Sequence, residues 1–198
     1  MSLLELIIAS SLMLVLVGAT YLALSAGLSY QRRNDALMDM EQSGMNALTY
    51  LTRKLAEANY ETVEVQAPPD AAITYSSYRD LNGSIRYDSN GRQLWDSVIC
   101  FRIKNENSIL RLVEQTEEVG GTHLDPLRPS ALSTPRTPSY YASSSIPARV
   151  LANNIETLSA QTAPSGGPKA LTLTLQFAIT ANNRKYGLKL AGKVHPRN

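Results

Sequence analysis

The first 31 residues constrain this chain most, because they form an almost unbroken apolar segment that contains one charged side chain, Glu5. About 20 apolar residues in helical form span the hydrocarbon core of a bilayer. The stretch from Leu6 to Leu28 meets that length. An ionisable group in such a segment is costly and usually has a partner, so we expect Glu5 to be functional. An α-amino group, with an ordinary pKa of about 7.7 to 8.0, is its natural partner.

The run Met1-Ser2-Leu3-Leu4-Glu5, followed by the apolar segment, resembles the mature amino terminus of bacterial type IV pilins and type II secretion pseudopilins. The resemblance implies that a prepilin peptidase removes a short basic leader and that the new amine, on Met1, is N-methylated. It also implies that Glu5 pairs with the amino terminus of a neighbouring subunit during assembly. A plain signal anchor, with Glu5 among the lipid headgroups, is the alternative for this segment.

The same resemblance implies where the protein resides and what it binds. The subunit would lie in the inner membrane before assembly and then in an extracellular, cell-surface filament or a periplasmic pseudopilus. Its partners would be copies of itself or other pilins in a helical filament. Because no basic leader precedes Met1, we expect the numbering to be that of the mature chain. Arg32 and Arg33, taken alone, would place the carboxy-terminal side in the cytoplasm, whereas the family places it outside.

Composition predicts one globular head behind the apolar segment. The chain has 198 residues, of which 18% are charged, and a net charge of +2. Such a weak charge gives no strong signal for nucleic acid. The single cysteine, Cys100, excludes an internal disulfide, and its place in the apolar run 98–101 predicts a small buried side chain.

The helical pattern continues past the apolar segment. Leucine and methionine recur every three or four residues from Leu37 to Leu55, with charged residues between them. We therefore predict one continuous helix over 2–59, about 85 Å long at 1.5 Å per residue. Glycine costs about 1 kcal/mol in a helix interior, so Gly18, Gly27 and Gly44 are weak points. Pilins often unwind near a proline at position 22; here that residue is Leu22, which either argues against such unwinding or shifts it toward Gly18.

After residue 59 the apolar period changes to two, which predicts strands. Candidate strands are 62–66, 72–78, 85–87, 96–104, 109–116, 150–161, 171–179 and 186–190. The strands 96–104 and 109–116 form the clearest early hairpin, joined through Asn105-Glu106-Asn107. Asn182-Asn183 is expected to turn the strand from Leu171 into the next one. This part of the chain loosely resembles the J-type pseudopilins and the W-type minor pilins. The similarity is in the order of three features along the chain: the run 149–155, then an alternating strand pair, then a terminal Arg197-Asn198.

The segment 117–147 differs from its surroundings. It is rich in proline, serine and threonine and contains the pair Tyr140-Tyr141. Long loops of this kind are usually functional or disordered, so we place it at the surface.

No pattern of catalytic or metal-binding residues appears. His123 and His195 are isolated, whereas a zinc site needs three or four ligands at set spacings. The run Asp88, Asn90 and Gly91 faintly resembles a calcium loop, but Ile99 occupies the position of the acidic twelfth ligand. We predict no enzyme activity, no cofactor and no metal.

Together these features predict an α+β fold: one long amino-terminal helix, apolar and then amphipathic, packed on an antiparallel sheet. The expected organisation is an apolar membrane or filament-core helix, 1–28, and a globular head, 29–198. The head would contain the amphipathic helix 29–59 and a sheet region, 60–198. The expected function is that of a structural subunit of a type IV pilus or pseudopilus-like filament, as a major or a minor subunit. The alternative is a monomeric membrane-anchored binding module that uses the 117–147 loop.

Overall fold

The computed structural model describes residues 3–68, 71–119, 123–162, 169–181 and 184–197. The chain divides into two compact units, Met1–Asp39 and Met40–Asn198. The helix α1, Leu3–Glu57, supplies all of the described part of the first unit and begins the second. Its bounds confirm the predicted continuous helix to within two residues at each end.

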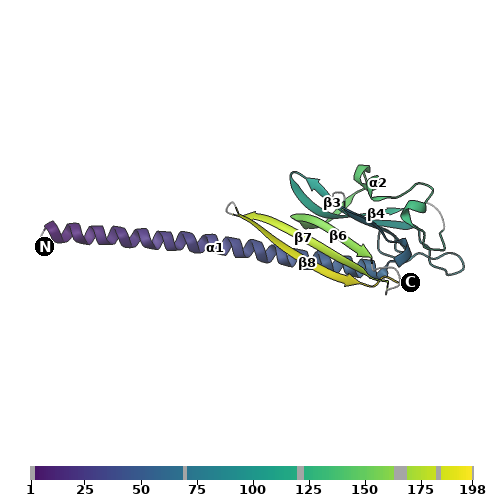
Figure 1. Ribbon diagram of the computed structural model, residues 1–198, viewed down its shortest axis with the longest axis horizontal. Helices are drawn as coiled ribbons and strands as arrows, with labels where there is room; N and C mark the ends of the chain where they lie inside the picture. The colour runs from purple at the N-terminus through teal and green to yellow at the C-terminus, as the bar shows by residue number, and fades with distance from the viewer. Residues whose placement is uncertain (1–2, 69–70, 120–122, 163–168, 182–183, 198) are drawn as a thin grey trace. The chain divides into compact units, whose positions relative to one another are not determined.

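The second unit contains two antiparallel sheets. The five-stranded sheet has the order β1-β2-β3-β4-β5, and the three-stranded sheet has the order β6-β7-β8. Their strands are β1 Glu64–Gln66, β2 Ala72–Ser77, β3 Ser97–Glu106, β4 Ile109–Glu118, β5 Ala148–Asn153, β6 Ile155–Thr162, β7 Leu171–Ala181 and β8 Arg184–Val194. The part of α1 that belongs to the second unit, from Met40 on, runs alongside β6, β7 and β8 (Figure 1). A long helix with antiparallel sheets confirms the predicted α+β class.

The hairpin of β3 and β4 turns later than predicted. Ser97 pairs with Glu118 at the open end and Glu106 with Ile109 at the closed end. The two turn residues are Asn107 and Ser108, with φ of 54° and 64°. Two left-handed residues match the twist of the flanking strands, so Asn105 and Glu106 stay in the ladder and the predicted connection is wrong by two residues.

The predicted strand 150–161 is two strands in different sheets. β5 pairs with β4 and β6 pairs with β7. Asn154 lies between them with φ of 60°, a left-handed conformation that asparagine tolerates better than most residues. This one residue redirects the chain from one sheet to the other.

Two shorter predictions also change. Residues 60–62 form a 3₁₀ turn, η1 Tyr60–Thr62, so the first strand begins only at Glu64. Residues 85–87 form no strand. Ile85 and Tyr87 make only isolated β-bridges, to Arg79 and Gln93 respectively. Asp80 and Asp88 instead order this segment, since the Oδ1 atom of each accepts two backbone N–H bonds across an Asn-Gly turn.

The helix packs closely on the three-stranded sheet. The strictly alternating residues Leu171, Leu173, Leu175 and Phe177 of β7 are all fully buried, as the sequence predicts. The matching face of α1 is Met40, Gly44, Ala47, Leu48, Leu51 and Leu55. A Cβ atom on Gly44 would lie 2.8 Å from Leu190 Cδ1 and 3.0 Å from Phe177 Cε2, so glycine permits this close approach.

Most described residues of the segment 117–147 are exposed, as its placement at the surface predicts, but a few of its side chains pack on the five-stranded sheet. The segment contains η2 Pro129–Ala131 and α2 Pro138–Ser143. Its Leu132 and Tyr141 are buried in a cluster with Ala72, Val98, Cys100 and Val119. Ser76 and Gln115 of the sheet bond the carbonyls of Leu127 and Ile146. The polar composition of the segment gave no sign that Leu132 and Tyr141 are buried or that 138–143 form a short helix.

Several sequence predictions fall outside the described residues. These are Met1, Pro69, the Asn182-Asn183 turn and the loop 163–168.

Candidate functional site

The apolar segment presents its side chains to the outside all the way round. Leu3, Leu14 and Tyr21 are 81%, 74% and 71% exposed, and every described residue before Arg33 is exposed. By length and composition, α1 is a helix that could cross a membrane. Exposed apolar area on this scale marks a surface that lipid or other protein covers. The structure therefore shows a long apolar helix that is compatible with a membrane anchor.

The described serine and threonine hydroxyl groups in this segment are satisfied within the helix itself. Ser10, Ser11, Ser25 and Ser29 each donate to the backbone carbonyl three residues earlier, at 2.7–3.0 Å. Thr20 donates to the carbonyls of Leu16 and Val17. Such back-bonding removes the cost of an unsatisfied hydroxyl in an apolar medium. These serine and threonine residues are therefore compatible with an apolar environment around the helix, because their hydroxyl donors are already hydrogen-bonded.

Three of the predicted site residues, Glu5, Gly18 and Gly27, lie on α1. Glu5 is in the first turn of α1. Gly18 and Gly27 lie within the unbroken helix, and a Cβ atom at either would meet nothing within 4 Å. Their place as weak points stays a prediction, and Met1 lies outside the described residues.

A pocket of about 580 Å³ opens on the second unit, a feature that the sequence did not predict. Tyr50 and Lys54 of α1 form one wall, and Leu81 in the turn 80–83 forms another. Glu114 of β4 and Arg149 of β5 also line it. The Tyr50 hydroxyl donates to Glu114 Oε2 at 2.9 Å and meets Oε1 at 3.2 Å.

The charges around this pocket are unevenly paired. The Glu114 side chain is 8% exposed, whereas that of Arg149 is 68% exposed and reaches Glu114 at 4.0 Å. Arg149 and Lys54 both lie over the Tyr50 ring, at 5.1 and 5.7 Å from its centroid. Burial and, after it, the Glu114 carboxylate raise the pKa of Tyr50 to about 12. The Tyr50 hydroxyl is thus held neutral as a donor to a buried carboxylate.

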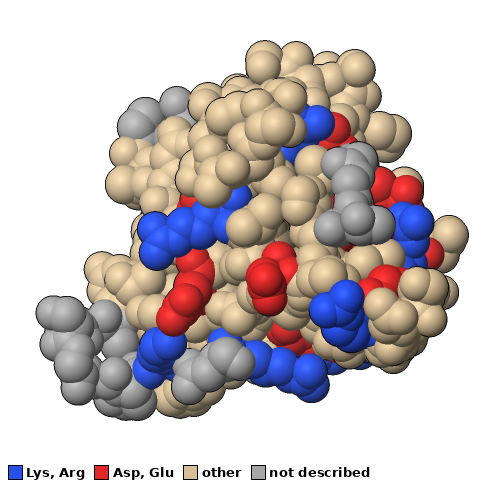
Figure 2. All heavy atoms as spheres, turned by 90° about the vertical axis from the view of Figure 1, so that its right-hand side faces the viewer, with Lys and Arg blue, Asp and Glu red and all other residues tan. Residues whose placement is uncertain are grey.

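Charge elsewhere on the second unit is mixed. Figure 2 shows acidic and basic side chains interspersed over the face turned to the viewer. Several charged residues outside the pocket form local ion pairs, such as Arg86 with Asp96 at 2.7 Å and Arg136 with Glu117 at 2.8 Å.

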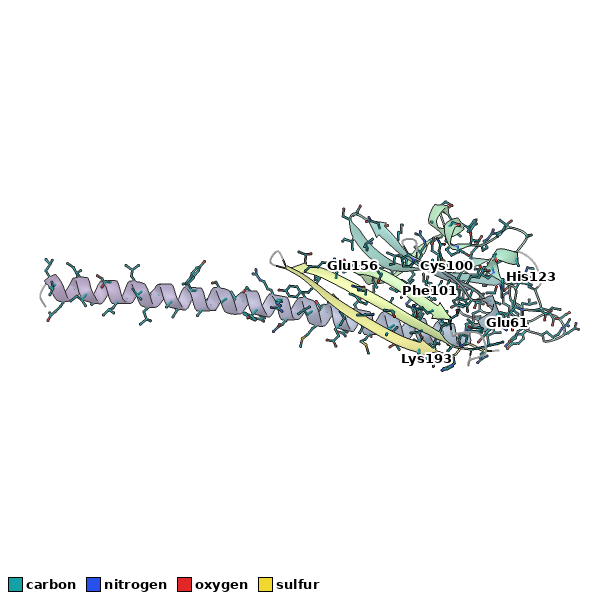
Figure 3. All side chains as sticks on the ribbon, viewed as in Figure 1. Glu61, Cys100, Phe101, His123, Glu156 and Lys193 are labelled. Carbon is teal, nitrogen blue, oxygen red and sulfur yellow. The ribbon has the colours of Figure 1, made fainter. Side chains whose placement is uncertain are left out.

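Residues with reactive chemistry are scattered or buried. No group of three or more His, Cys, Asp and Glu that could hold a metal occurs in the described residues. Cys100 is fully buried, as predicted, and burial raises the pKa of its thiol to about 12. Figure 3 shows Cys100 and Phe101 in the five-stranded sheet, away from His123. Cys100 is therefore an unreactive core side chain.

No family model matches this chain, and neither a curated protein nor a solved structure matches it.

Proposed function

We propose that this protein is a structural subunit of a type IV pilus or pseudopilus-like filament, polymerised through residues 1–28. The observation that carries the proposal is the apolar half of α1, exposed on every side, with its described serine and threonine hydroxyl groups bonded within the helix. A helix that is apolar all round requires an apolar environment on all sides. The bilayer meets this need before assembly, and a bundle of identical helices meets it afterwards.

Glu5 supplies the register in this proposal. It is the one charged residue in the first 31 residues and lies in the first helical turn. Within a bundle, the carboxylate and a neighbour's amino terminus each compensate the other's charge. A buried ion pair often adds little net stability, but breaking it leaves an uncompensated charge that costs about 3–5 kcal/mol. One axial stagger satisfies both charges, so the pair selects that stagger.

Substitution of Glu5 tests this proposal. Glu5→Gln should reduce the number of filaments per membrane-bound subunit, and Glu5→Lys should reduce it further by placing like charges together. Membrane insertion should stay normal. Asp125→Lys is the matched control, because Asp125 is an exposed residue of the second unit. Wild-type filament numbers with Glu5→Lys would overturn the assigned role.

The alternative, an anchored monomer that binds through 117–147, has weaker support. Leu132 and Tyr141 of that segment are buried in the core cluster, so part of it serves the fold. Sedimentation of sheared material separates the two functions, because a filament pellets and an anchored monomer stays with the membrane.

A further inference from the structure

One face of α1 joins an exposed methionine to two carboxylates. Asp35, Met38 and Asp39 are related as i, i+3 and i+4, so they share a face of the helix. All three are exposed, Met38 to 69%. Among the described residues Asp35 and Asp39 make no ion pair or hydrogen bond, whereas most acidic groups of the second unit have a basic or backbone partner. We call this set the acidic methionine face.

The pocket on the second unit has the opposite character. Its apolar lining includes Leu81, Ile99 and Pro147, and Leu81 is 59% exposed. Three basic side chains, Lys54, Arg79 and Arg149, line it against two acidic ones, Asp80 and Glu114. Within the described part of the chain Lys54 has no acidic partner, and Arg149 has only Glu114 at the 4.0 Å limit. The third cation of the pocket, Arg79, is held by Glu57 and by the carbonyl of Gly83.

We propose that the acidic methionine face of one subunit docks in this pocket of a second copy of the chain. Met38 would fill the apolar part, and Asp35 and Asp39 would pair with Lys54 and Arg149. An apolar anchor flanked by complementary charges is a common arrangement at the centre of protein interfaces. Methionine suits this role because its flexible thioether adapts to an irregular cavity. The inference rests on the proposed filament and adds a contact outside the apolar segment.

Charge reversal tests the pairing. Asp35→Lys with Asp39→Lys should lower the number of filaments per membrane-bound subunit, and so should Lys54→Glu with Arg149→Glu. The four changes together should restore assembly, because the charges are complementary again. A loss of 1.4 kcal/mol of contact energy corresponds to about a tenfold change in an association constant. Lys189→Glu with Lys193→Glu is the control, since both lysines lie exposed on β8 outside this pocket.

A cross-linking experiment keeps the test valid if a charge variant folds poorly. Met38→Cys and Leu81→Cys are made in separate chains and co-expressed, so that a disulfide between them must join two copies. Cys100 is fully buried and gives little background. We expect cross-linked dimers in sheared filaments, and few with Met38→Cys and Tyr87→Cys, because Tyr87 is 55% exposed and lies outside the pocket.

The outcomes separate this contact from the filament itself. If wild-type chains form no filaments, the proposed function fails. If wild-type filaments form but neither charge reversal affects them and Met38→Cys does not cross-link to Leu81→Cys, the docking contact fails alone. A quadruple variant that assembles worse than either double variant would also overturn the pairing.

Discussion

Tyr50 on α1 donates its hydroxyl to Glu114 on β4, 64 residues later in the chain, at 2.9 Å. The Tyr50 ring also meets Phe101 of β3 edge-on, with centroids 6.5 Å apart. The same tyrosine therefore contacts two strands of the five-stranded sheet, while Leu48 and Gly44 of α1 contact the three-stranded sheet. Tyr50 is the polar part of the attachment between helix and sheet.

Tyr50→Phe should destabilise the protein by about 1–3 kcal/mol, the usual cost of leaving a buried polar group without its partner. Because phenylalanine keeps the ring packing on Phe101, the decrease in the free energy of unfolding measures the loss of the hydrogen bond to Glu114. Denaturant unfolding of the full chain in detergent measures the change. Tyr87→Phe is the control, because Tyr87 is 55% exposed. Equal free energies of unfolding for Tyr50→Phe and wild type would contradict the role of this bond.

Alkaline pH should weaken the same attachment. The pKa of Tyr50 rises from 10.0 to about 12 on folding, because burial and Glu114 disfavour the phenolate. A raised pKa stabilises the neutral form, so its contribution is complete below pH 10 and is lost between pH 10 and 12. The tyrosinate absorbance of wild type minus that of Tyr50→Phe should therefore titrate in the upper part of this range. Titration of the difference near pH 10 would show that Tyr50 is not protected.

Gly44→Ala should destabilise the second unit although alanine favours helices. The new Cβ atom would lie 2.8 Å from Leu190 Cδ1, and overpacking of this kind costs about 1–3 kcal/mol. The gain in helix propensity is about 1 kcal/mol, so the clash is expected to prevail. Gly187→Ala on β8 is the control, because its Cβ atom would lie 3.6 Å from the backbone oxygen of Phe177, a normal contact. Thermal unfolding measures the midpoint temperature of each variant and of wild type. A midpoint for Gly44→Ala above that of wild type would contradict the prediction.

Tyr141 should behave as a core residue despite its place in a polar segment. Its side chain is fully buried, and its hydroxyl has no hydrogen-bond partner among the described residues. Tyr141→Ala should cost about 3–5 kcal/mol. Tyr141→Phe should be neutral or stabilising, since it removes a buried hydroxyl without a partner. Denaturant unfolding measures the free energy of unfolding of both variants. A loss well below about 3 kcal/mol for Tyr141→Ala would contradict the assignment of this side chain to the core.

Local periodicity accounts for what the sequence predicted well. The three-to-four spacing of α1 and the strict alternation of β7 are visible in single segments, and both elements are found within two residues of their predicted bounds. The turns moved because left-handed conformations at Asn107, Ser108 and Asn154 are set by the partner strands. No local pattern distinguishes those residues from other polar ones.

The pocket and the cover of the five-stranded sheet depend on contacts between distant segments. Tyr50 and Glu114 carry no shared motif, and Tyr141 stands among serines that indicate a loop. Their roles follow from where the sheets place them. Glu5 is the opposite case, because its position in an apolar segment is visible in the sequence by itself.

The most direct test of the central claim is electron microscopy and sedimentation of sheared material from cells that make the full chain or a chain lacking residues 1–28. The full chain should pellet as filaments with helical order. The shortened chain should stay in the supernatant as a folded monomer, because the core of the second unit begins at Met40. A full-length chain that remains with the membrane and shows no filaments, or a shortened chain that still polymerises, would contradict assembly through the apolar helix.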